Sequence, residues 1–104
     1  MMRAWLFLLW ALFTANIYAQ KISIVQVNAE WNERNNIDLN GIRGARVSFG
    51  YLEQQPESLR KKIKAVPTIL VFKDGHLVHY WEANLSFKLN IRQEEIQEYI
   101  TSIQ

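Results

Sequence analysis

The chain has 104 residues, with 12 Lys and Arg against 10 Asp and Glu, two His and no Cys. This length fits one small domain. The absence of cysteine excludes disulfide bonds and any thiol chemistry by the chain itself. The net charge of +2 is too near neutral to indicate nucleic acid or a membrane surface as a partner.

The first 19 residues have the pattern of a secretory signal peptide. Arg3 gives a basic start, the stretch from Ala4 to Ala15 is almost entirely apolar, and Ala19 is a suitable cleavage position. The apolar run is shorter than the roughly 20 residues that a membrane-spanning helix needs. We therefore expect cleavage of residues 1–19, a periplasmic or secreted domain over residues 20–104, and no membrane span after cleavage. Retention of the segment as an uncleaved anchor stays open.

Four segments have the pattern of β-strands. Ile22–Val27 is β-branched and apolar at most positions, which is typical of a central strand covered on both faces. Arg46–Leu52 alternates between apolar and polar side chains. Thr68–Phe72 and Leu77–Trp81 flank the pair Asp74–Gly75, and Asp-Gly between apolar runs is typical of a tight hairpin. We expect these last two strands to be antiparallel neighbours.

Helical segments are predicted between the strands and at the end of the chain. Residues 32–44 are rich in Asn, Asp and Gly, so any helix there is expected to be short. Pro56 at a first helical position, with Leu59 and Ile63 four residues apart, predicts a brief amphipathic helix. Asn90 is a candidate N-cap for a last helix. The apolar face of that helix would consist of Ile96, Tyr99, Ile100 and Ile103.

Two blocks of this sequence resemble the thioredoxin family. Ile63–Gly75, which contains Val66, Pro67 and Thr68, is similar to the thioredoxin segment with the cis-proline and the following hairpin. Ile24–Trp31 is similar to the strand and the Ala-Glu-Trp sequence that lead into the thioredoxin active site. The resemblance implies an α/β, thioredoxin-like fold in the order β-α-β-α-β-β-α, with a four-stranded mixed sheet and helices on both faces. It implies a minimal version, without the first strand and helix of many members.

The departures from the family's pattern bear on its chemistry. The two redox cysteines of the family align with Asn32 and Asn35, and its buried acid aligns with Gln26. A carboxamide provides neither the thiolate nucleophile nor the resolving thiol of dithiol exchange. The alignment therefore implies that this chain is not an enzyme, has no disulfide reductase, oxidase or isomerase activity, and uses no cofactor.

The loops beside the lost cysteines form the candidate binding site. In the family, the backbone of the residue before the cis-proline pairs with an extended peptide, which implies a site for an exported polypeptide or an assembly partner. Trp31 would be an apolar platform, and Asn32 and Asn35 would offer amide donors and acceptors. The candidate residues are Trp31, Asn32, Asn35, Val66, Pro67 and Thr68.

Other interpretations of these residues stay open. Pro67 could serve only to shape the entrance to the following strand, and Asn32 could be the N-cap of the helix that follows Trp31. A second function is an accessory subunit that presents a substrate to a separate cysteine-bearing enzyme.

Three further features of the sequence carry weaker signals. His76 and His79 lie three residues apart around a predicted strand and should point to opposite faces, so they do not predict a metal site. Asn84–Ser86 matches the N-glycosylation acceptor pattern, whose use depends on the host. Tyr80, Trp81 and Phe87 are expected to cover the core under the last helix, with an exposed contact patch as the alternative.

Overall fold

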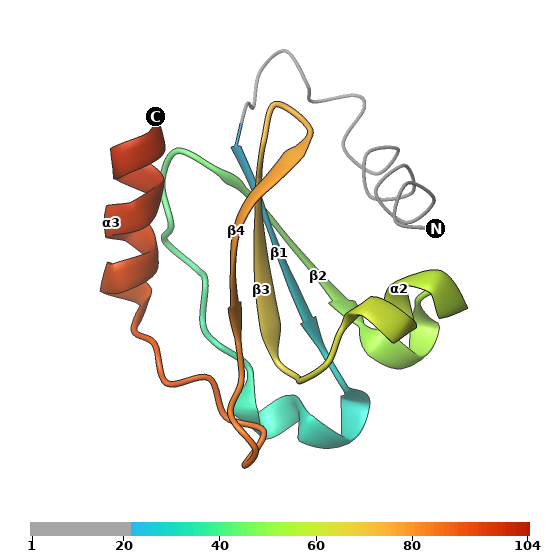
Figure 1. The fold of residues 1–104 in the computed structure, drawn as a ribbon. Coiled ribbons are helices and arrows are strands. Elements are labelled where there is room, and N and C mark those ends of the chain that lie inside the picture. The colour runs from blue at the N-terminus through green and yellow to red at the C-terminus, as the bar shows by residue number, and fades with distance from the viewer. Residues whose placement is uncertain (1–21) are drawn as a thin grey trace.

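The structure is a computed structural model, and it describes residues 22–104 (Figure 1). The predicted signal peptide, residues 1–19, lies outside the described residues. No helix within residues 22–104 combines the length and the hydropathy that a membrane span requires. The elements in chain order are β1 (Ile22–Asn28), η2 (Glu30–Asn35), β2 (Arg46–Tyr51), η3 (Leu52–Gln54), α2 (Glu57–Lys62), β3 (Thr68–Lys73), β4 (His76–Glu82) and α3 (Gln93–Ile103).

The four strands form one mixed sheet in the order β2-β1-β3-β4. β1 pairs with β2 in parallel and with β3 antiparallel, and β3 pairs antiparallel with β4. The hairpin between β3 and β4 turns at Asp74 and Gly75, whose φ angles of 54° and 84° are left-handed. These are the conformations that a two-residue Asp-Gly turn requires. The predicted sheet and its hairpin are confirmed.

Each face of the sheet buries its own apolar cluster. Val25 and Val27 of β1 pack with Leu59 of α2, while Ile22 and Ile24 pack on the opposite face with Ile96 and Ile100 of α3. This division follows from the strand period of two, which sends successive side chains to opposite faces. Figure 1 shows α2 and α3 on the two sides of the sheet. The prediction of helices on both faces is confirmed.

The first predicted helix is a short 3-10 helix, η2, and the chain then crosses to β2 in irregular structure. Gln26 fixes this crossover to the sheet, because its side-chain Nε2 donates to the carbonyl oxygen of Ile37 at 2.9 Å. Its Oε1 accepts from the N–H of Ile37 at 2.8 Å. Leu39 of the crossover is buried in the cluster under α3. A buried amide with both groups paired is a stable arrangement, so Gln26 has a structural role.

Both helix starts differ from the prediction. Pro56 is the residue before α2, and Arg92, not Asn90, is the residue before α3. The backbone N–H of Arg92 donates to the carboxylate of Glu95 at 3.1 Å, which satisfies one group at the start of the helix. Leu89 and Ile91 pack against the cluster under α3, which keeps this stretch outside the helix.

Candidate functional site

Three segments that are far apart in sequence meet at one end of the sheet. They are η2, the loop before β3, and the turn of residues 84–88 after β4 (Figure 1). Asn32 of η2 lies within hydrogen-bond distance of the loop, since its Nδ2 is 3.3 Å from the carbonyl oxygen of Val66. The Val66–Pro67 peptide bond is cis. The fold therefore brings Asn32 and Val66 together, as the resemblance implies.

The side chain of Asn32 connects all three segments. Asn32 is only 4% exposed. Its Nδ2 also lies 3.0 Å from the Oδ1 of Asn28 and 3.0 Å from the carbonyl oxygen of Phe87. Its Oδ1 accepts from the Nδ2 of Asn35 at 2.7 Å. Asn32 lies at a kink inside η2, with φ and ψ of −109° and 18°, so it directly precedes the second turn of this helix, and its Oδ1 is paired with the side chain of Asn35.

Asn28, at the end of β1, is a site residue that the sequence reasoning missed. It is fully buried, and its Oδ1 accepts from the N–H of Ala29 at 2.8 Å. Its Nδ2 donates to the carbonyl oxygen of Asn32 at 3.0 Å and also to the side chain of Asn36. A polar residue that ends a buried apolar strand is the signal that could have indicated it. We call Asn28, Asn32, Asn35 and Asn36 the asparagine cluster.

The residues around the proline are buried and support the end of the sheet. Val66 is 5% and Thr68 is 3% exposed, and Pro67 is fully buried. The Oγ1 of Thr68 donates to the carbonyl oxygen of Ala65. The N–H of Ala83 donates to the carbonyl oxygen of Pro67 at 3.1 Å, which joins the loop to the end of β4. These buried residues therefore fix the position of the loop and do not form its exposed surface.

Trp31 is the exposed member of the predicted set. It is 65% exposed, and its ring meets that of Phe87 edge to face, with centroids 5.0 Å apart and an interplanar angle of 89°. Phe87 is 44% exposed, so the expectation that it covers the core under the last helix is wrong. Trp81 does pack against the cluster under α3. We call Trp31 and Phe87 together the aromatic patch.

The surface beside Trp31 is acidic. The hydroxyl of Tyr51 donates to the carboxylate of Glu33 at 3.0 Å. That hydrogen bond, together with the negative charges of Glu33, Glu30 and Glu53, raises the pKa of Tyr51 above its ordinary value of 10.0. The N–H of Glu30 also donates to both carboxylate oxygens of Glu53, at 3.1 and 3.0 Å. Three carboxylates therefore lie near Tyr51, and two of them, Glu30 and Glu33, belong to the same 3-10 helix as Trp31.

The asparagine cluster contains amides, which neither titrate in the physiological range nor act as nucleophiles. Within residues 22–104, no group of three or more His, Cys, Asp or Glu side chains is placed to hold a metal ion. The arrangement can hold three loops in one geometry and present two aromatic rings to solvent.

No family model and no curated protein sequence matches this chain. Solved structures do resemble it. A thioredoxin from Halobacterium salinarum NRC-1 has a TM-score of 0.61 at 17% identity, covering 81% of this chain and 75% of that one. The Fasciola hepatica thioredoxin has a TM-score of 0.60 at 20% identity, covering 89% and 91%. The oxidised thioredoxin from Plasmodium falciparum has a TM-score of 0.52 at 18% identity, covering 89% and 90%.

These similarities place the chain in a structural class. The chain has a thioredoxin-like fold, which confirms the fold expected from the resemblance. It combines this fold with a sequence that contains no cysteine.

Proposed function

We propose that this chain is an exported, redox-inactive thioredoxin-like domain that binds a polypeptide or an assembly partner through the aromatic patch. The observation that carries the proposal is the exposed contact between Trp31 and Phe87, next to a hydrogen-bonded asparagine cluster in which Asn28 and Asn32 are buried. Large aromatic side chains are the commonest anchors of protein interfaces.

Rigidity of the loops supports this function. A binding surface loses less conformational entropy on association when its side chains and loops are already ordered. Asn32 bonds to the carbonyl oxygen of Phe87 in the folded domain, so the two rings of the patch are carried by segments that are joined before any partner arrives. The nearby carboxylates of Glu30, Glu33 and Glu53 favour a partner with basic side chains next to its apolar contact.

The proposal gives the six predicted residues different roles. Trp31 makes the contact with the partner, and Asn35, which is half-buried, lies at its border. Asn32, with Val66 to Thr68, acts as support, because these residues are buried and the carbonyl oxygen of Val66 already accepts from Asn32. Phe87 joins the contact set, in line with the alternative interpretation of the sequence that placed it in an exposed contact patch.

Truncation of the aromatic patch is expected to abolish capture of the partner. Trp31→Ala and Phe87→Ala each remove an exposed ring, so each should weaken capture about tenfold or more while leaving the fold unchanged, since interface anchors commonly account for about 2 kcal/mol or more. Capture is measured by photo-crosslinking from position 85, because Leu85 is 98% exposed in the same turn as Phe87. The crosslinked band should disappear in both variants.

Phe49→Ala is the matched control for this experiment. Phe49 is exposed to almost the same extent as Phe87, 45% against 44%, but it lies on β2. Its truncation should leave the crosslinked band at its original intensity. A band that survives both patch variants, or that Phe49→Ala also removes, would place the partner elsewhere.

The purified chain is expected to show no turnover in an insulin-reduction assay with dithiothreitol beyond the rate of the reductant alone. Thiol–disulfide exchange requires a thiolate, and the positions that resemble the active-site cysteines are Asn32 and Asn35. Catalytic turnover by the isolated chain would contradict redox inactivity. Turnover that appears only when a thiol protein from the same compartment is added, and that depends on this chain, would instead support the accessory-subunit function.

A further inference from the structure

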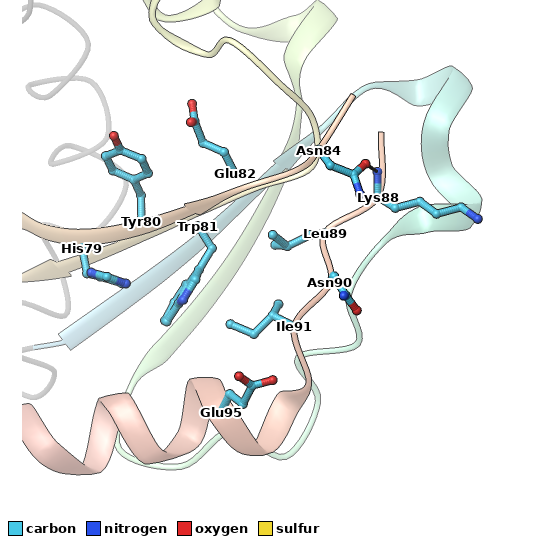
Figure 2. A pocket seen from close by; sticks show the side chains of 10 residues that line it. All are labelled: His79, Tyr80, Trp81, Glu82, Asn84, Lys88, Leu89, Asn90, Ile91 and Glu95. Carbon is cyan, nitrogen blue, oxygen red and sulfur yellow. Dashed lines mark hydrogen bonds between the residues drawn. The ribbon is translucent and has the colours of Figure 1, made fainter. Parts of the chain in front are cut away.

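A groove with a volume of about 550 Å³ runs along the outer edge of β4 (Figure 2). One wall consists of four consecutive strand residues, His79 to Glu82, and the other includes Leu89, Ile91 and Glu95. β4 is the last strand in the order β2-β1-β3-β4, so this side has no neighbouring strand among residues 22–104. The groove therefore borders an unpaired strand edge.

The pairing with β3 shows which backbone groups of β4 face the groove. The N–H of Ala83 donates to the carbonyl oxygen of Pro67, so residue 83 pairs inward. In an antiparallel ladder, every second residue directs both its N–H and its C=O to the same neighbour. The register is regular from Ile69↔Trp81 to Val71↔His79. The backbone N–H and C=O groups of Trp81 and His79 therefore point toward β3. The N–H and C=O groups of Tyr80 and Glu82 point outward, into the groove.

Side chains at the groove differ between the two faces of the strand. Figure 2 shows Trp81 directed toward Ile91 and α3, whereas Tyr80 and Glu82 project from the other side of β4. Leu89 and Ile91 are half-buried beside Trp81, which makes that side apolar. Glu82 is exposed and supplies a negative charge on the opposite side. Glu95 already forms an ion pair with Arg92 at 3.9 Å.

We propose that this edge of β4 binds an extended segment of another polypeptide as a fifth strand, with apolar and basic side chains in alternation. Backbone groups of the segment would pair with the outward N–H and C=O groups of Tyr80 and Glu82. Its apolar side chains would fill the groove against Trp81 and Ile91, and its basic side chains would lie beside the Glu82 carboxylate. Asn84 and Lys88, from the turn that carries Phe87, line part of the groove, but Trp31 and Phe87 themselves do not. The proposal therefore does not depend on the aromatic patch.

The test uses the synthetic peptide acetyl-Thr-Lys-Val-Lys-Val-Thr-amide and the isotope-labelled protein, with binding followed by NMR. At about 1 mM peptide, a concentration suited to a weak complex, the amide resonances of Tyr80 and Glu82 should shift and their hydrogen exchange should slow. Tyr80→Pro should weaken binding about three- to tenfold relative to Tyr80→Ala, because proline removes only the outward N–H at an edge position where it is tolerated. Glu82→Lys should also weaken binding by several fold.

Two controls distinguish strand addition at β4 from binding by side chains alone and from binding at the aromatic patch. A peptide N-methylated at all four Lys and Val residues keeps its side chains but loses the backbone donors that would face β4 in an added strand of either direction. It should bind at least threefold more weakly than its parent. Trp31→Ala should leave the affinity for the parent peptide unchanged. The proposal is overturned if the amides of Tyr80 and Glu82 do not respond, if the N-methylated peptide binds as well as its parent, or if Trp31→Ala abolishes binding. Should Tyr80→Pro fail to fold, the N-methylated peptide still decides.

Discussion

Leu70→Ala is expected to lower the free energy of unfolding by about 2–5 kcal/mol, the range for large-to-small substitutions in a packed core. Leu70 lies in β3 and is 4% exposed, in the cluster with Val25, Val27 and Leu59 that α2 covers. Its truncation removes apolar contacts from this cluster and leaves a cavity. Urea denaturation followed by circular dichroism measures the loss. Because small domains are stable by only about 5–15 kcal/mol, this variant should have a visibly lower midpoint.

Leu85→Ala removes the same atoms from a surface position and is the matched control. Leu85 is 98% exposed, so its truncation should change the free energy of unfolding by less than about 0.5 kcal/mol. Similar effects at positions 70 and 85 would contradict the burial of β3 between two layers. A small effect at position 70 alone would mean that the cluster under α2 is not packed as described.

The strands could be predicted because their signals are local. The apolar run of β1, the alternation of β2 and the Asp74–Gly75 pair each depend on neighbours within a few residues, and the structure has a strand or a turn at each place. The hydrophobic positions of α3 were found for the same reason, since Ile96 and Ile100 form one face of a helix.

The contacts of the site could not be predicted because they join distant segments. Trp31 and Phe87 are separated by most of the domain, and no local pattern indicates that their rings meet. Asn28 looks like an ordinary strand end until η2 folds back over it. The start of α3 was misplaced for a related reason. Asn90 has good capping chemistry, but the packing of Leu89 and Ile91 against the cluster under α3 delays the helix to Gln93.

Polar side chains join the loops at the positions where the resemblance implies redox residues. In this chain, Asn32 and Asn35 contact each other directly at the positions where the resemblance implies two cysteines. Gln26 likewise occupies the position of the family's buried acid and binds the crossover through two hydrogen bonds. These residues pair with backbone groups of the loops, and buried backbone groups need such partners whatever chemistry the site performs.

Asn32→Ala is therefore expected to destabilise the domain by about 2–4 kcal/mol. The substitution removes the Asn32 donor from the carbonyl oxygens of Val66 and Phe87, and an unsatisfied buried group costs about 1–3 kcal/mol. The Oδ1 of Asn28 also loses this donor but still accepts from the N–H of Ala29. Partial relaxation and water entry reduce the sum. The loss is measured by urea denaturation at equilibrium, beside Asn40→Ala, which truncates an exposed asparagine of the crossover and should change stability by less than about 0.5 kcal/mol.

Hydrogen exchange in the native state tests whether Asn32 acts by joining the segments. The N–H of Phe87 donates to the carbonyl oxygen of Asn84 within the turn, at 3.0 Å. If Asn32 holds this turn against η2, the N–H of Phe87 should exchange faster in Asn32→Ala by a larger factor than the amides at the centre of β1, such as that of Val25. Equal acceleration at both places would show only a global loss of stability. An unchanged rate at Phe87 would show that the turn is ordered without Asn32, and that the aromatic patch does not depend on the asparagine cluster for its geometry.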